Sequence, residues 1–225
     1  MTTPINDVVF LFDVDNTLLD NDRVQADLSA HLSYEYGSVA RDRYWEIFEV
    51  LRSELGYADY LGALERYRLE ALHDPRVLRV SNWLVDYPFT DRLYPQALEV
   101  VHQARRWAPS VILSDGDAVF QPRKVERSGL WHAFDGHVLI YIHKEQELED
   151  VARFYPAHHY VMVDDKLRIL AKMKDIWGDR LTTVFPRQGH YATDPETLAT
   201  YPHGDIQLDH IGDLLKLDLG DFLRS

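Results

Sequence analysis

Short runs of hydrophobic residues alternate along the chain with longer stretches in which hydrophobic positions recur at helical spacing. This alternation is typical of a Rossmann-like α/β fold, a parallel sheet flanked by helices. The runs are nearly continuous, which predicts strands buried on both faces. The predicted strands are residues 8–12, 111–113, 138–142, 160–163 and 181–185. The predicted helices are residues 96–107, 123–128, 145–154 and 166–176, and residues 205–217 (DIQLDHIGDLLKL) predict an edge strand followed by a closing helix.

One interval breaks this alternation. Between the first and second predicted strands, about ninety residues contain no convincing strand, far more than one crossover connection needs. Within them, Tyr44, Phe48, Leu51 and Leu55 recur at helical spacing, and a similar series starts at Tyr60. The sequence therefore predicts an α/β core domain, residues 1–20 and 90–225, with a helical domain inserted at residues 21–89.

Composition and charge limit the classes of binding partner that are expected. The 225 residues are 46% hydrophobic and 27% charged, as in ordinary globular proteins. A formal net charge of −13 disfavours nucleic acids and anionic membrane surfaces, so a small molecule is the expected partner. No hydrophobic run is long enough for a membrane span, the start does not resemble a signal peptide, and we expect a cytoplasmic protein. Nothing in the sequence sets the oligomeric state.

Chemically versatile side chains follow four of the predicted strands. In an open parallel sheet, ligands bind beyond the carboxyl ends of the strands, so these side chains should meet at one edge. The residues are Asp13, Asp15 and Thr17 after the first strand, Ser114 after the second, Lys144 after the third, and Asp164 and Asp165 after the fourth. Clustered carboxylates repel one another by roughly 4 kcal/mol per pair at 4 Å and an effective dielectric constant of 20, so a cation is expected among them. Oxygen ligands suit a hard divalent cation such as Mg²⁺.

This ordered set resembles the haloacid dehalogenase superfamily, most of whose members are phosphatases. Asp13, Asp15 and Thr17 match its first motif, Asp-x-Asp-x-Thr, and the other strand ends match its second, third and fourth motifs. The inserted segment takes the place of the family's helical cap domain. The resemblance implies a Mg²⁺-dependent phosphohydrolase that cleaves a small phosphorylated metabolite, a phosphomonoester.

The resemblance also implies residue roles. Asp13 would attack phosphorus to form an aspartyl phosphate, Asp15 would act as acid and then base, and Lys144 would offset the negative charge. The phosphate would be held by Thr17, Ser114 and the backbone N–H groups around Asp115 and Gly116. The metal ligands would be the Asp13 side chain, the Asp15 carbonyl group and the paired acids. We favour Asp165 for direct contact and leave open whether Asp164 also touches the metal.

Each signal has a simpler structural explanation. Asp13, Asp15, Asp164 and Asp165 precede helices and could cap them. Lys124 competes with Lys144 for the role of the site lysine, but it lies on a predicted helix and we expect it to be solvated. The loop of residues 186–192 brings Arg187 or His190 toward the site only if that loop turns inward.

Other functions remain open for a protein with this fold and these motifs. A sugar-phosphate mutase would keep every motif, and a non-catalytic phosphate-binding or regulatory domain would keep the fold. Halide-displacing members of the superfamily lack the second aspartate, so Asp15 argues against dehalogenation. The phosphonate-cleaving branch needs a cap lysine, and residues 21–89 contain none. Asp115 departs from the asparagine that many relatives have there.

Overall fold

The structure, a computed structural model, describes residues 5–223, which form one six-stranded parallel sheet. The strands are β1 (Asn6–Phe12), β2 (Ser110–Asp115), β3 (Val138–Tyr141), β4 (Ala157–Val163), β5 (Leu181–Pro186) and β6 (Ile206–Leu208). Their order is β3-β2-β1-β4-β5-β6, which places β1 at the centre. Phe12 is in register with Ile112 on β2 and Val163 on β4, so the carboxyl ends of the central strands lie together. The predicted α/β sheet is confirmed.

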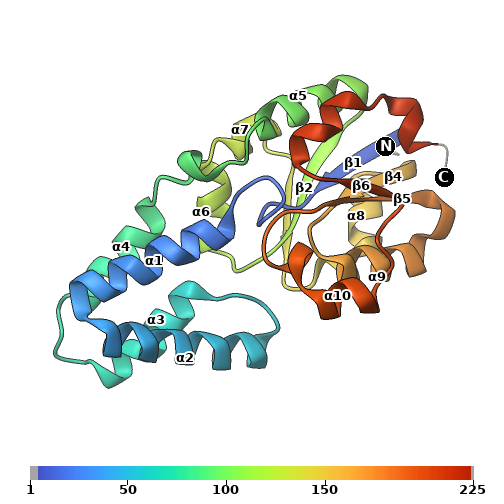
Figure 1. Cartoon of the computed structure of the whole chain (residues 1–225). Coiled ribbons are helices and arrows are strands. Elements are labelled where there is room, and N and C mark those ends of the chain that lie inside the picture. The colour runs from blue at the N-terminus through green and yellow to red at the C-terminus, as the bar shows by residue number, and fades with distance from the viewer. Residues whose placement is uncertain (1–4, 224–225) are drawn as a thin grey trace.

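Helices cover both faces of this sheet (Figure 1). The α-helices are α1 (Asn21–Tyr36), α2 (Ser38–Leu55), α3 (Tyr60–Glu70), α4 (Val77–Asp86), α5 (Ala97–Trp107), α6 (Phe120–Arg127), α7 (Leu130–Ala133), α8 (Leu148–Phe154), α9 (Leu167–Trp177) and α10 (Pro195–Thr200). Short 3-10 helices are η1 (Phe89–Arg92), η2 (Lys144–Gln146), η3 (Gly178–Arg180), η4 (Tyr191–Thr193), η5 (Ile211–Lys216) and η6 (Leu219–Phe222). None of the helices within residues 5–223 has both the length and the apolar composition that crossing a bilayer requires.

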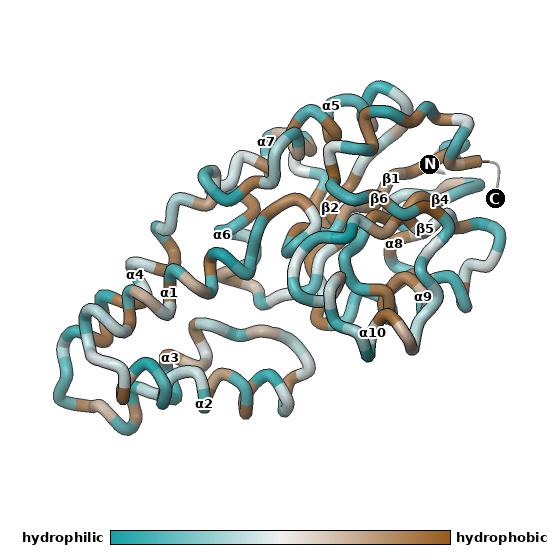
Figure 2. Tube along the Cα trace, viewed as in Figure 1, coloured by the Kyte–Doolittle hydropathy of each residue, from teal (hydrophilic) through white to brown (hydrophobic). Residues whose placement is uncertain are grey.

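The central strand supplies side chains to both layers of the core. Phe10 and Phe12 belong to the hydrophobic cluster that includes α5 and α7, whereas Val9 and Leu11 pack with α8 and α9. This alternation follows from the two-residue period of a strand. Hydrophobic residues consequently follow one another along the central strands, as Figure 2 shows, and explain why the predicted strands lack a polar face.

Three predicted helices differ from the structure, and the first of them, expected at residues 123–128, spans Phe120–Arg127. The helix expected at residues 145–154 begins only at Leu148, because the chain first forms η2, where the Lys144 N–H donates to the Asp115 carboxylate at 2.8 Å. The closing helix expected after the edge strand is the 3-10 helix η5, which spans only six residues. Such short runs commonly take the tighter 3-10 form.

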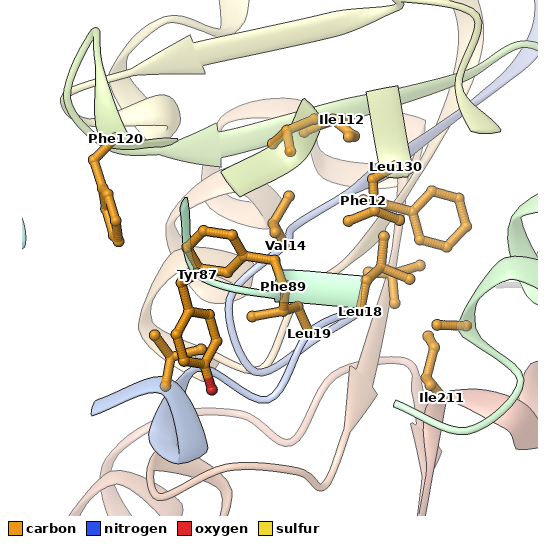
Figure 3. Close-up of a cluster of buried hydrophobic side chains, with 14 of the residues drawn as sticks. Phe12, Val14, Leu18, Leu19, Tyr87, Phe89, Ile112, Phe120, Leu130 and Ile211 are labelled. Atoms are coloured by element: carbon orange, nitrogen blue, oxygen red, sulfur yellow. The ribbon is translucent and has the colours of Figure 1, made fainter. Parts of the chain in front are cut away.

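The helical cap, α1–α4, extends away from the sheet in Figure 1. Its interior includes Tyr44, Phe48 and Tyr60 of the series that the spacing predicts, whereas Leu55, at the end of α2, is exposed. Where the cap returns to the core, Tyr87 and Phe89 pack near Phe120 of α6, in the cluster of Figure 3. The exact division into domains at residues 20/21 and 89/90 stays a prediction.

The centre of the sheet provides a test of the core. Phe12 is fully buried, and its ring lies 5.7 Å from that of Phe134. We expect Phe12→Ala to lower the free energy of unfolding by about 3–5 kcal/mol, because it removes apolar contacts and leaves a cavity. Urea denaturation measures the change. Ile176→Ala, at a side chain that is 53% exposed, is the control and should change stability by about 0.5 kcal/mol or less. Equal effects of the two substitutions would contradict the assignment of the core.

Candidate functional site

The carboxyl edge of the sheet brings together the residues that the sequence predicts. Asp13 directly follows β1, Asp164 directly follows β4, and Ser114 is the second-last residue of β2. Lys144 opens η2, three residues beyond the end of β3. All four side chains are at most 1% exposed. The parallel topology therefore assembles a buried polar cluster in which Asp13 lies more than 100 residues from the other three in the sequence.

A buried lysine holds two of the carboxylates. The Lys144 Nζ atom lies 2.5 Å from Asp13 Oδ1 and 2.6 Å from Asp164 Oδ2. Burial alone would raise the pKa of Asp13, but the ammonium groups of Lys144 and Lys166 outweigh it and lower the pKa. Burial alone would lower the pKa of Lys144, and the two carboxylates instead raise it. At neutral pH Asp13 is thus an ionised carboxylate beside a charged lysine.

Asp165 has no such partner. Its carboxylate is fully buried, and neither oxygen has a hydrogen-bond partner among the described residues. Carboxylate oxygens of Asp13, Asp164 and Asp165 lie within 4.8 Å of one another. Burial raises the pKa of Asp165 well above its usual value, with the charges of Asp164 and Asp13 adding to the shift, and burial raises the pKa of Asp164 to about 6. These unsatisfied oxygens have the chemistry of a site for a hard divalent cation.

Two hydroxyl groups border the Asp13 carboxylate. Thr17 Oγ1 lies 3.4 Å from Asp13 Oδ2 and also accepts the Asp165 N–H at 3.1 Å, so it ties the ends of β1 and β4 together. Ser114 Oγ lies 3.5 Å from Asp13 Oδ1. The Gln121 amide donates to Ser114 Oγ at 3.0 Å. The sequence analysis did not single out Gln121.

The loop after β2 differs in part from its predicted role. The Asp115 carboxylate accepts the Lys144 N–H, and burial raises its pKa. The Gly116 N–H donates to the Tyr141 carbonyl group at 2.9 Å, so in this arrangement it is already engaged and does not offer itself to a phosphate. A Cβ atom at Gly116 would lie 2.5 Å from the Gln121 side chain, which explains the glycine. These residues connect the β2 and β3 loops.

The expectation that Lys124 is solvated is wrong. Lys124 is fully buried, and its Nζ atom lies 2.6 Å from Asp15 Oδ1 and 3.0 Å from Asn21 Oδ1. The reason is the position of α6, whose buried face carries Phe120, Gln121 and Lys124 toward the junction with the cap. The shared spacing of Gln121 and Lys124, three residues apart on a helix that also buries Phe120, is the signal that sequence reasoning missed.

A cavity of about 490 Å³ opens between the sheet edge and the cap. Its walls include Asp15, Gln121 and Lys166 from the core and Gln25, Arg52 and Tyr60 from the cap. His190 also lines the cavity and contacts Asp22 at 2.6 Å, whereas Arg187 pairs with Asp209 on the surface. Cavities of this size hold small organic ligands.

Comparison with known proteins agrees with this geometry. Residues 8–173 match the family model described as haloacid dehalogenase-like hydrolase. The chain belongs to this hydrolase family. A crystal structure of a haloacid dehalogenase-like hydrolase from Burkholderia xenovorans LB400 is 62% identical, with a TM-score of 0.91, covering 95% of this chain and 99% of that one. No curated protein gives a significant match.

More distant solved structures share the fold. The L-2-haloacid dehalogenase of Xanthobacter autotrophicus is 19% identical, with a TM-score of 0.59, over 95% of this chain and 98% of that one. The HAD-hydrolase YfnB of Bacillus subtilis, bound to magnesium, is 16% identical, with a TM-score of 0.61, over 98% of this chain and 100% of that one. At these identities the likeness establishes the architecture of core and cap, and the chemistry must be argued from the site.

The unpartnered Asp165 yields a prediction about metal-dependent stability. Because the pKa values of Asp164 and Asp165 are raised on folding, their protons stabilise the folded state at low pH, and this contribution is lost as the pH rises through the folded pKa values. At a pH high enough to ionise Asp165, Asp165→Asn should therefore stabilise the metal-free protein by about 1–3 kcal/mol. The same substitution should abolish the rise in melting temperature that Mg²⁺ produces in the wild type.

Thermal unfolding with Mg²⁺ and with EDTA measures both effects. Asp175→Asn, at an exposed position on α9, is the matched control and should behave as the wild type. A Mg²⁺-induced rise that persists undiminished in Asp165→Asn would show that the cation does not bind at this cluster.

Proposed function

We propose that this protein is a Mg²⁺-dependent phosphohydrolase that cleaves a small phosphomonoester through an aspartyl phosphate on Asp13. The observation that carries the proposal is the buried Asp13–Asp164–Asp165 cluster, with its unpartnered Asp165, beside a second aspartate, Asp15, that lines the cavity. Displacement of a halide from carbon needs one carboxylate nucleophile but neither a cation nor Asp15. The site contains more acidic groups than dehalogenation uses.

The residues present fit a magnesium ion. Asp165 would offer an unengaged carboxylate oxygen, and the Asp13 side chain and the Asp15 backbone carbonyl group would complete the protein ligands. Asp164 Oδ2 already contacts Lys144, and its Oδ1 accepts the Lys166 N–H at 2.8 Å, so we assign it to holding the loop and Lys144. The ion would neutralise the carboxylates and the phosphate, allowing them to approach one another.

Asp13 has the properties of the nucleophile. Its pKa is lowered, its position is fixed by Lys144 and Thr17, and its N–H donates to the Val163 carbonyl group at 2.9 Å. In the first step a carboxylate oxygen of Asp13 forms a bond to phosphorus, and the bond from phosphorus to the leaving oxygen breaks. In the second step water attacks phosphorus, releases phosphate and restores the carboxylate. Lys144 offsets the negative charge throughout.

The contacts of Asp15 support a role in proton transfer. Its Oδ1 atom contacts Lys124, whereas Oδ2 is contacted by the Gln121 amide only at 3.4 Å. We assign proton transfer to Oδ2, which gives its proton to the leaving alkoxide in the first step and takes one from water in the second. Proton transfer by a positioned side chain contributes about 10²–10⁴-fold to the rate.

The cap selects a small substrate. The cavity is enclosed by core and cap together, and a net charge of −13 disfavours polyanions such as nucleic acids. We therefore propose a small phosphorylated metabolite as the substrate, with residues 21–89 acting as the cap domain and residues 1–20 and 90–225 as the catalytic domain. Arg52 of the cap lines the cavity, and we propose that it binds a second anionic group of the substrate.

The experiment that tests this function is phosphate release from a panel of small phosphomonoesters, with Mg²⁺ and with EDTA. Chloride release from L-2-chloropropionate is measured in parallel. We expect phosphate release that EDTA abolishes and no chloride release. EDTA-insensitive chloride release would overturn the proposal, and conversion of a sugar phosphate to its isomer without net phosphate release would identify a mutase instead.

Asp13→Asn should abolish turnover, because an amide cannot attack phosphorus. The expected loss is at least about 10⁴-fold in kcat. Phosphate release by the purified variant measures it and also shows whether a contaminating phosphatase contributes. Activity near that of the wild type would refute the assignment of the nucleophile.

Asp15→Asn should separate proton transfer from metal binding. We expect kcat to fall by about 10²–10⁴-fold while the Mg²⁺-dependent rise in melting temperature remains, since the backbone carbonyl group is unchanged. Substrates with better leaving groups should lose less activity because they need less protonation. An equal loss for good and poor leaving groups would contradict the acid role.

A further inference from the structure

We propose that Lys124 is a positioning residue that couples the Asp15 carboxylate to the cap through Asn21 and Tyr60. Lys124 lies on core helix α6, whereas Asn21 opens cap helix α1 and Tyr60 opens cap helix α3. A single buried ammonium group thus contacts a carboxylate of the site and an amide of the cap. The expected effect of Lys124 on turnover rests on the proposed function, but its expected effect on the cap does not.

The hydrogen bonds that link Asp15, Lys124, Asn21 and Tyr60 can run in only one direction. A lysine ammonium group donates and cannot accept, so the amide oxygen of Asn21 must face Lys124. The amide nitrogen of Asn21 is then left to donate to the Tyr60 hydroxyl group at 3.2 Å, and Gln25 donates to the same hydroxyl at 2.9 Å. The donor and the acceptor of each hydrogen bond are therefore set by the bond before it, from Asp15 to Tyr60.

Contacts with aromatic rings reinforce the connection between the core and the cap. The Lys124 ammonium group lies 5.3 Å from the centre of the Phe120 ring, and the Phe120 ring lies 5.1 Å from that of Tyr60. Phe120 and Lys124 share one face of α6, so the same helix gives the cap a hydrophobic and a polar contact. Movement of the cap away from the core would break both contacts at once.

The energetics explain why the link is effective. Lys124 is fully buried, and an ammonium group removed from water needs its partners. With the cap in place it has two oxygen partners, Asp15 and Asn21. Without the cap it would keep only Asp15 and gain solvent, and the Asp15 side chain would lose the fixed ammonium group that orients it. The position of the cap and the orientation of Asp15 therefore depend on each other.

The first test needs no substrate. In Lys124→Met, amide hydrogen exchange in residues 24–32 and 63–69 of the cap should accelerate by about tenfold or more, while exchange in the sheet stays as in the wild type. Lys174→Met is the matched control, because Lys174 forms an ion pair with Asp205 at 2.9 Å on the far helix α9. Unchanged exchange in the cap of Lys124→Met would overturn the proposal.

Two tyrosine variants keep the proposal testable if Lys124→Met does not fold. Tyr60→Phe removes only the hydroxyl group at the end of the chain, and it should also accelerate exchange in the cap. Tyr44→Phe is its control, because the Tyr44 hydroxyl donates to the Tyr60 carbonyl group at 2.9 Å and does not line the cavity. Equal exchange in the two tyrosine variants would show that the chain from Lys124 does not hold the cap.

The second test measures turnover. Lys124→Met should lower kcat by about tenfold or more with a much smaller change in KM, because Asp15 acts in the chemical step. Lys124→Ala should regain activity with added propylammonium but not with propanol, which has a similar shape and no charge. A merely structural role would lower the folded fraction and leave kcat per folded molecule unchanged.

The two tests distinguish failure of the proposed function from failure of the positioning role of Lys124. If the wild type releases no phosphate from any substrate, the proposed function fails, and hydrogen exchange still decides the coupling. If the wild type is active and Lys124→Met keeps both its kcat and the exchange rates of its cap, only the positioning role of Lys124 is overturned.

Discussion

The contact of the buried Lys144 ammonium group with Asp13 and Asp164 is the interaction on which the rest of the site depends. Without it, two carboxylates would lie in the core with no ammonium group in direct contact, and breaking such a buried pair typically costs about 3–5 kcal/mol. The same contact keeps Asp13 ionised beside the cavity. It also connects the ends of β1, β3 and β4, so that the fold and the chemistry share one constraint.

The parallel sheet makes this contact possible. Strands that run in one direction bring their carboxyl ends to one edge, and the residues after β1 and β4 therefore meet although they are 150 positions apart in the sequence. The hydrophobic side chains of β1 fix the register on both faces. Stability of the core and alignment of the site are consequently two results of the same packing.

Much of this arrangement could be predicted from the sequence because it depends on local pattern. Continuous apolar runs mark buried strands, and polar residues after them mark the edge where ligands bind, which is how Asp13 and Lys144 are found. The burial of Lys124 was not predicted because a charged residue on a helix is normally solvated, and only the placement of the cap over α6 buries it. The unequal surroundings of Asp164 and Asp165 likewise depend on side-chain positions that sequence does not contain.

In the proposed reaction, Asp13 carries the phosphoryl group during turnover. The most direct measurement is to mix the enzyme and Mg²⁺ with a phosphomonoester radiolabelled on phosphorus, quench in acid during the first turnover and locate the label by peptide mapping. The account predicts label on the peptide that contains Asp13 and none in Asp13→Asn. Release of labelled phosphate by the wild type with no label on that peptide at any quench time would contradict it.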